Sequence, residues 1–265
     1  MRGVFLLLWI AGSGLGFAED LWIVPPHLPA APAALPAKVS VRLNLGEQFP
    51  TSSHLLEPER IVRFDAIDQA GVRVLTSYRV EGLSLVSDLE LPAGGLMLAL
   101  SVGPRIIRLG AEEFNQHLLQ DAVLQVYETR RQYDQLDRPV SERRRRHGKA
   151  LLGAPGPRGD LFLRPVGAPL EIVPLTDPTR LGSGELLEVR VLSRGRPAPG
   201  LTILGAGALS RSSQFSAVTD DYGEAAFPPD SPGLWYIHVV DMRRLQGDPE
   251  ADFDCEWATL TFEIR

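Results

Sequence analysis

Val39-Ser40-Val41-Arg42-Leu43-Asn44-Leu45 is the stretch that decides the fold class. Its apolar and polar residues alternate strictly, and this period of two is typical of a β-strand with one buried face. Similar short apolar runs recur along the chain, separated by turn-forming residues such as glycine, proline and aspartate. They occupy residues 61–67, 72–75, 83–89, 96–102, 187–191, 201–204, 234–240 and 257–264. The pattern therefore predicts a mainly β protein.

The composition excludes several classes of protein. The 265 residues include 25 glycines and 22 prolines, an enrichment that suits many short strands better than a helical bundle. Lys and Arg number 27 against 33 Asp and Glu, and the net charge of -6 argues against a nucleic-acid partner, because phosphate recognition needs a basic face. A single cysteine excludes a disulfide framework and any multi-thiolate metal site.

The first residues have the pattern of an export signal. Arg2 precedes an apolar run over residues 4–10, and Gly16-Phe17-Ala18 places small residues at the −3 and −1 positions of a cleavage site. We therefore expect residues 1–18 to be a signal peptide, with Glu19 as the mature N-terminus; the alternative is an uncleaved anchor helix. No later stretch of the sequence reaches the ~18 consecutive apolar residues of a membrane span. The mature chain is thus expected to be periplasmic or otherwise extracytoplasmic, with no membrane span.

The strand runs fall into two groups, and the residues between them change period. Residues 19–110 predict an N-terminal β-sandwich and residues 168–265 a C-terminal one, both immunoglobulin-like. Residues 111–167 are expected to form a helical segment and linker, because Phe114, Leu118, Ala122 and Val126 recur at helical spacing. The predicted fold is therefore mainly β, with two β-sandwich domains joined by a short helical segment.

A second helix is predicted over residues 141–152, capped by Ser141 and ended by Gly153. It carries the most basic run of the chain, which consists of Arg143, Arg144, Arg145, Arg146, His147 and Lys149. In an acidic protein we interpret this run as a solvated helix face, and an anion-binding patch is the alternative.

Residues suited to catalysis are scattered through the sequence. The histidines His27, His54, His117, His147 and His238 show no His-x-His or His-x3-His spacing that would place two imidazoles on one metal ion. The single cysteine lies among acidic residues, which disfavour a reactive thiolate. No pair of nucleophile and base can be named, so the sequence predicts a protein that is not an enzyme.

Several motifs carry a resemblance to a known family. They are Glu19-Asp20-Leu21-Trp22-Ile23, Glu112-Glu113-Phe114-Asn115, Lys149-Ala150-Leu151-Leu152, the run 164–174, Asp177-Pro178, Gly195-Arg196-Pro197 and Trp257-Ala258-Thr259-Leu260-Thr261-Phe262. Because these motifs occur together in this order, the chain resembles an extracytoplasmic family of unknown function whose members are often described as the substrate-specific component of nickel or cobalt uptake. Residues 187–240 are also similar to the carboxypeptidase-regulatory or transthyretin-like sandwich, a non-catalytic module, so the resemblance implies a transthyretin-like C-terminal domain.

The resemblance implies a protein that binds a divalent metal ion. Family members typically carry histidine where this chain has Glu19 and histidine before the methionine where it has Asp241-Met242, and some carry histidine in the loop held here by Glu47-Gln48. Carboxylates in place of imidazoles shift the preference from nickel or cobalt towards harder cations. The candidate metal ligands are Glu19, Asp20, Glu47, His238 and Asp241, and the expected cofactor is a divalent metal ion.

Two functions remain open at this stage. The first is an exported, non-catalytic binding or accessory protein linked to divalent metal uptake, with an envelope or transporter protein as its partner. The alternative is a structural or protein-interaction module of the cell envelope. Neither function involves nucleic acid. Whether the candidate ligands converge in space distinguishes the two.

Overall fold

The computed structural model describes residues 19–26, 35–208 and 215–264, so the expected signal peptide, residues 1–18, lies outside the described residues. The strands are β1 Asp20–Val24, β2 Ala37–Gly46, β3 Ile61–Asp68, β4 Gly71–Val74, β5 Arg79–Glu81, β6 Ser84–Leu91, β7 Leu96–Leu109, β8 Val140–Leu152, β9 Leu170–Pro174, β10 Leu187–Ser193, β11 Arg196–Pro197, β12 Thr202–Gly207, β13 Phe215–Val218, β14 Glu224–Phe227, β15 Gly233–Arg244 and β16 Phe253–Ile264. The helices are α1 Ala111–Gln120 and α2 Leu124–Gln132, with short 3-10 turns at Pro58–Arg60, Leu161–Leu163 and Pro178–Arg180.

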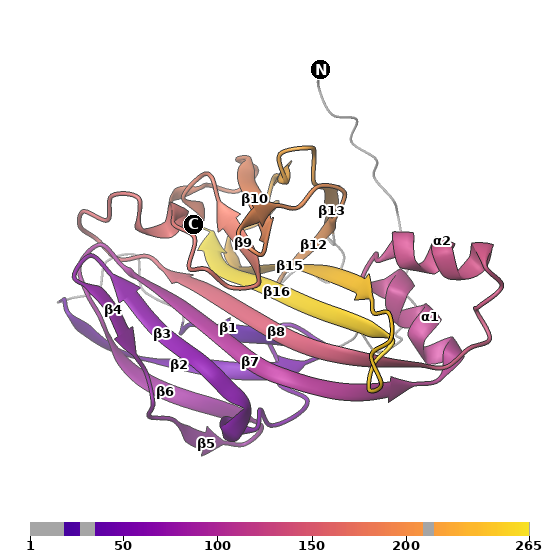
Figure 1. Cartoon of the computed structure of the whole chain (residues 1–265). Coiled ribbons are helices and arrows are strands. Elements are labelled where there is room, and N and C mark those ends of the chain that lie inside the picture. The colour runs from indigo at the N-terminus through magenta and orange to yellow at the C-terminus, as the bar shows by residue number, and fades with distance from the viewer. Residues whose placement is uncertain (1–18, 27–34, 209–214, 265) are drawn as a thin grey trace.

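The strands form three sheets (Figure 1). The largest has eight strands in the order β13-β12-β15-β16-β8-β7-β3-β4. A four-stranded sheet has the order β1-β2-β6-β5, and a small sheet has the order β11-β10-β14, with β9 also paired to β10. The pairing of β8 with β16 is parallel, whereas the other described pairs are antiparallel. The expectation of a mainly β protein is confirmed.

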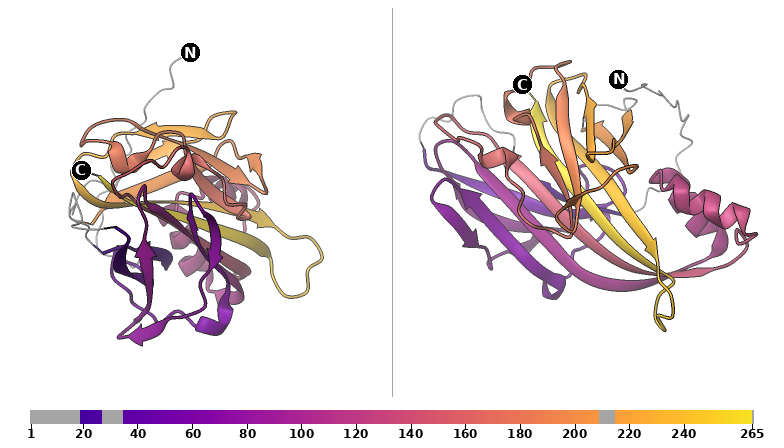
Figure 2. Two further views of the ribbon diagram at one scale, coloured as in Figure 1. Left: turned by 90° about the vertical axis from the view of Figure 1, so that its left-hand side faces the viewer. Right: turned by 45° about the horizontal axis from the view of Figure 1, so that its top comes forward.

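The eight-stranded sheet runs through both halves of the chain, and this differs from two separate sandwiches joined by a helical segment. One apolar core lies between the four-stranded sheet and the β3, β7 and β8 part of the long sheet. A second core lies between the small sheet and the β12, β15 and β16 part (Figure 2). Strand β8, from the expected linker 111–167, lies near the middle of the long sheet. The halves therefore share a sheet because β8 pairs with β7 on one side and β16 on the other.

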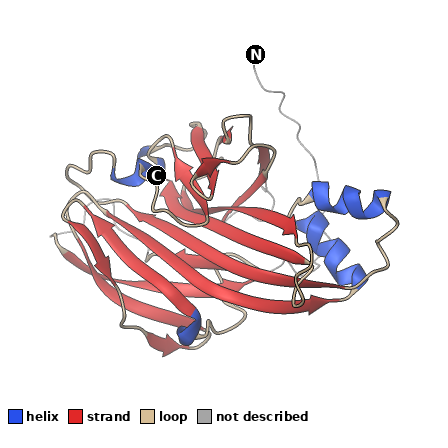
Figure 3. Ribbon diagram, viewed as in Figure 1, coloured by secondary structure: helices blue, strands red, loops and turns tan. Residues whose placement is uncertain are grey.

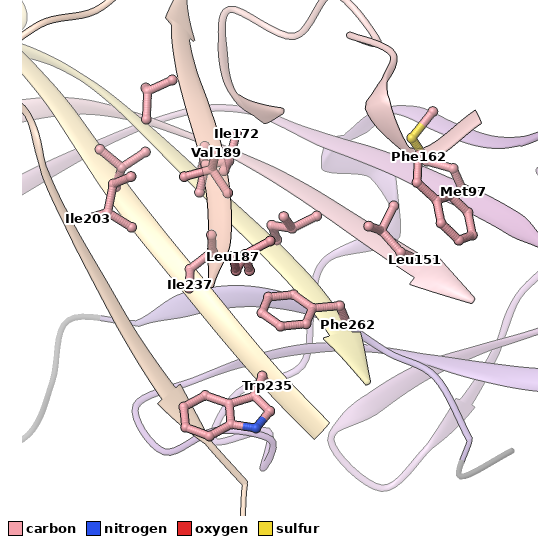
Figure 4. Close-up of a cluster of buried hydrophobic side chains, with 14 of the residues drawn as sticks. Met97, Leu151, Phe162, Ile172, Leu187, Val189, Ile203, Trp235, Ile237 and Phe262 are labelled. Atoms are coloured by element: carbon pink, nitrogen blue, oxygen red, sulfur yellow. The ribbon is translucent and has the colours of Figure 1, made fainter. Parts of the chain in front are cut away.

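The second core shows how segments distant in sequence pack together (Figure 4). Trp235 and Ile237 on β15 point to the same side because alternate residues of a strand share a face. Val189 on β10 packs into the same cluster, together with Met97 from β7. These side chains are all but inaccessible to solvent. The core therefore ties the C-terminal strands to a strand of the N-terminal half.

The prediction of a helix over residues 141–152 is wrong, because Val140–Leu152 is strand β8. The interpretation of its basic run as a solvated face is also wrong, since Arg144, Arg146 and Lys149 are each at most 5% exposed. Charged side chains rarely lie inside a sheet unless partners compensate them. The partners come from strands and loops distant in sequence, which a local pattern does not reveal.

The first predicted helix is confirmed in part. Helix α1 contains Phe114 and Leu118, which are buried against the long sheet. The predicted helix does not continue to Val126, because Ala122 has a φ of 53° and interrupts the helix between α1 and α2. The two helices cover one end of the long sheet (Figure 3). Within the described residues, neither is long and apolar enough to cross a membrane.

Candidate functional site

The charged residues of strand β8 lie alternately on the two faces of the long sheet. Glu142, Arg144 and Arg146 lie on the face that α1 covers, together with Trp257 of β16. We call the polar groups buried on this face the helix-side cluster; its members are Asp20, His117, Asp121, Glu142, Arg144, Arg146 and His238. The intervening residues of β8 point to the opposite face, and we call their contacts the ion-pair ladder.

Asp20 and His238 form the centre of the helix-side cluster. Strand β1 brings Asp20 against β15, where its Oδ2 lies 3.3 Å from His238 Nδ1. The contact has the distance of an ion pair but not the geometry of a hydrogen bond, so His238 Nδ1 has no hydrogen-bond partner among the described residues. The other carboxylate oxygen, Asp20 Oδ1, also has none among them. Burial opposes the charging of His238, but Asp20, aided by Asp121, outweighs burial and raises the pKa of the imidazole.

His117 on α1 and Asp121, which caps the C-terminus of that helix, form a second pair. They are four residues apart, and His117 Nδ1 lies 3.2 Å from Asp121 Oδ2. Burial, together with Arg144 and Arg146, lowers the pKa of His117 well below its ordinary value. Burial likewise raises the pKa of Asp121 to about 7. At neutral pH the pair therefore consists of a neutral His117 and an Asp121 that is about half ionised, whereas the charged form of His238 is favoured.

Two arginines and a tryptophan close the cluster. Arg144 bonds Glu142 at 2.6 Å, and its guanidinium lies 5.0 Å from the centre of the Trp257 ring. Arg146 donates from Nε to the carbonyl oxygen of Glu19 at 2.9 Å. Burial lowers the pKa of Arg146 to about 9, with a further contribution from Arg144. Arg146 thereby holds the start of β1 against the long sheet, and Arg144 Nη2, 3.4 Å from His117 Nε2, contacts α1.

The cluster leaves both acceptors and donors without hydrogen bonds. Among the described residues, its oxygens without a hydrogen-bond partner are Asp20 Oδ1, Asp121 Oδ2 and Glu142 Oε1, and its nitrogens without one are Arg146 Nη2 and His238 Nδ1. Buried carboxylate oxygens usually bond a donor, a water molecule or a cation. As the side chains stand, no three His, Cys, Asp or Glu residues in the described part of the chain surround a common point from which they could hold a metal ion.

The structure brings together only two of the five candidate ligands, Asp20 and His238. Glu19 instead bonds His54 at 2.7 Å. Glu47 is exposed, just beyond Gly46. Asp241 lies on the opposite face of β15, because it is three residues from His238 along a strand, and it accepts a hydrogen bond from Ser193 at 2.7 Å. The five residues therefore do not form one site.

Sequence reasoning missed His117 and Asp121 as members of the cluster. Their spacing of four residues within the predicted helix is the signal that could have paired them, since such residues share a helix face. Glu142 and Arg144 were missed because the alternation of β8 was interpreted as a helix.

The ion-pair ladder neutralises the opposite face of β8. Arg143 bonds Asp248 at 2.8 Å, and Arg145 bonds Asp254 at 2.6 Å. Further along the strand, Lys149 bonds Glu171. Arg143, Asp248 and Asp254 retain partial exposure, whereas Lys149 and Glu171 are buried. The basic run is thus structural on this face, because each of these cations has an acidic partner.

Ser101, His147 and Glu256 form a hydroxyl, imidazole and carboxylate row within the ladder. Ser101 Oγ lies 3.0 Å from His147 Nδ1, and His147 Nε2 lies 2.8 Å from Glu256 Oε2. The arrangement resembles the order of groups in a hydrolase triad. The adjacent cavity, however, has a volume of about 10 Å³, which holds about one water molecule.

The cations that line this cavity are already bonded. Lys149 donates to Glu171, and Arg63 donates to Asp65 and to the carbonyl oxygen of Val166. An oxyanion needs preorganised donors that are free to receive it. The row is therefore better explained as a satisfied polar contact between β7, β8 and β16.

These features define a mainly β protein whose long sheet carries a buried charged cluster on one face. The model of the family described as "Domain of unknown function (DUF4198)" matches residues 16–242, and the chain belongs to that family. No curated protein matches it.

Among solved structures, the chain is similar to a tetra-tandem repeat in the extending region of a large adhesion protein, with 11% identity and a TM-score of 0.22 over 92% of this chain and 49% of that one. It is similar to a mutant of Salmonella alpha-2-macroglobulin, with 11% identity and a TM-score of 0.25 over 95% of this chain and 15% of that one. A fragment of native alpha-2-macroglobulin from Escherichia coli gives 11% identity and a TM-score of 0.20 over 87% and 96%. The chain thus spans about half or less of the first two proteins.

Proposed function

We propose that this chain is an exported, non-catalytic binding protein of the cell envelope, and that its helix-side cluster takes a divalent cation. The observation that carries the proposal is the set of buried carboxylate oxygens without a hydrogen-bond partner, which lie beside two imidazoles. The four residues in question are Asp20, His117, Asp121 and His238. An accessory role in nickel or cobalt uptake, with an envelope or transporter protein as partner, is the form of this function that the family resemblance supports.

The chemistry of these side chains suits a first-row transition ion. Two imidazoles with two carboxylates give mixed nitrogen and oxygen ligands, which Ni²⁺ and Co²⁺ accept more readily than Ca²⁺ does. The four groups occur as two neighbouring pairs, Asp20 with His238 and His117 with Asp121. Binding of one ion by both pairs requires their side chains to move together, because as they stand no three of the described His, Cys, Asp or Glu residues surround a common point.

Thermal unfolding of the mature chain, residues 19–265, tests the proposal. We expect Ni²⁺ or Co²⁺, added after EDTA treatment, to raise the melting temperature more than Mn²⁺ or Ca²⁺. An ion present at a hundred times its Kd stabilises the folded state by about 2.7 kcal/mol. Asp20→Asn should abolish the stabilisation by the ion.

Asp241→Asn is the matched control, because it makes the same chemical change on the opposite face of β15. It should leave the stabilisation by Ni²⁺ intact. Equal responses of Asp20→Asn and the wild type, or the absence of any response to the four ions, would show that the cluster is not a cation site.

A further inference from the structure

Strand β7 has a long stretch of backbone that is paired on one side only. It pairs with β8 from Leu96 opposite Leu152 to Leu109 opposite Val140, except at Gly103 and Pro104, where the register shifts. On its other side, β3 pairs with it only as far as Val102. Beyond that point Arg60 donates to the carbonyl oxygen of Gly103, and no other hydrogen bond reaches this side within the described residues. We call the unpaired stretch, residues 103–109, the open edge; it forms the lower border of the long sheet in Figure 1.

Four of the seven residues of the open edge are exposed, and two of these are basic. Arg105 and Arg108 are exposed and form no ion pair or side-chain hydrogen bond with any described residue. Ile106, between them, is 40% exposed. An unpaired strand edge is a template for another strand, and proteins commonly protect such edges with charge or proline. On this edge Pro104 supplies the proline, and Arg105 and Arg108 supply the charge.

The charges select the kind of strand that can pair there. Antiparallel pairing of two copies about Ile106, the centre of the edge, would set Arg105 of each copy opposite Ile107 of the other, and Arg108 opposite Pro104, which has no backbone donor. A second copy of this chain therefore offers no carboxylate to either arginine. A strand with carboxylates at both positions would find complementary charges instead.

We propose that the open edge of β7 receives an extended acidic segment of a partner protein by strand addition. Main-chain hydrogen bonds supply the general affinity, and side chains at alternate positions supply specificity. The segment carries acidic residues three positions apart, one opposite Arg105 and one opposite Arg108, with an apolar residue opposite Ile106. This interaction is independent of the cation proposed for the helix-side cluster.

A labelled peptide, acetyl-Thr-Thr-Glu-Val-Val-Glu-Thr-Thr-amide, tests the proposal by fluorescence anisotropy with the mature chain. We expect saturable binding that weakens with salt and that protects the outward amides of residues 103–109 from hydrogen exchange. The double variant R105E/R108E should weaken binding about tenfold, and a peptide with lysine in place of both glutamates should regain it. The variant R196E is the matched control, because Arg196 is an exposed residue of β11.

The same measurements contain the results that would overturn the proposal. A peptide with proline in place of both valines keeps the charge but cannot pair as a strand; equal binding of this peptide would show plain electrostatic attraction. Failure of the glutamate peptide to bind, unchanged binding by R105E/R108E, or protection confined to other strands would each refute strand addition at this edge. Dimerisation of the chain that blocks the open edge would show that a second copy occupies it.

Discussion

Replacement of Lys149 by methionine removes the cation from a buried ion pair on the ladder side of β8. The ammonium donates to Glu171 and, at 3.1 Å, to the carbonyl oxygen of Ile172. Burial lowers the pKa of Lys149, while Glu171 acts in the opposite direction and favours the charged form. Lys149→Met therefore leaves the carboxylate of Glu171 in the interior without its cation.

Other contacts of Glu171 limit the loss of folding free energy that Lys149→Met causes. Removal of one partner from a buried ion pair costs about 3–5 kcal/mol. Glu171 still accepts hydrogen bonds from the backbone amides of Val166 at 2.6 Å and Gly167 at 2.9 Å. We therefore expect the lower end of the range, about 3 kcal/mol. In a chain of this size each kcal/mol changes the melting temperature by about 2–4 °C, so the melting temperature should fall by about 6–12 °C.

Urea and thermal unfolding, followed by circular dichroism, measure the effect. Lys38→Met is the matched control, because Lys38 is exposed on β2, and it should change stability by less than about 0.5 kcal/mol. Adding Glu171→Leu to Lys149→Met should recover part of the loss, since no buried charge then remains. The reasoning is refuted if Lys149→Met behaves like Lys38→Met, or if the double variant loses the sum of the two single effects.

Three further predictions concern the core, a turn and the cluster. Trp235→Ala should cost about 3–5 kcal/mol in chemical unfolding, because the indole is fully buried in the C-terminal core; a smaller loss would mean that the core collapses to fill the space. Gly223→Ala should lower the free energy of unfolding by about 1–3 kcal/mol, because φ is +72° and a Cβ would lie 2.7 Å from the carbonyl oxygen of Val191. Gly195→Ala, at a similar φ but with open space around the Cβ, should lower it less in the same assay. Asp121 holds a proton in the folded state up to about pH 7, so the free energy of unfolding in EDTA should fall as the pH rises from about 4 to 7, by at most about 4 kcal/mol. Asp121→Asn should flatten this pH profile. An unchanged profile would contradict the pKa shift of Asp121.

Local pattern predicted the strands whose two faces differ. The alternation in β2 is visible because one face meets the core and the other meets water. Strand β8 gives no such signal, since charged residues occupy both of its faces. Its partners are remote: His147 and Glu256 are 109 residues apart in the chain. The shared eight-stranded sheet follows from those remote pairings, so the local pattern could not predict it.

The candidate site was predicted in part for the same reason. Asp20 and His238 were named as ligands, and they do lie together. Asp241 was named with them, although alternation along a strand places residues three apart on opposite faces, and the structure shows it bonded to Ser193. His117 and Asp121 come from a helix that packs onto the sheet, and a sequence gives no measure of where a helix packs.

Equilibrium dialysis of the mature chain against Ni²⁺, followed by metal analysis, tests the cation site most directly. Our account predicts one ion per wild-type chain and per Asp241→Asn chain, and loss of the ion from chains that carry both Asp20→Asn and His238→Gln while circular dichroism shows them folded. Retention of the ion by that double variant, or a wild-type chain that binds no ion, would contradict it.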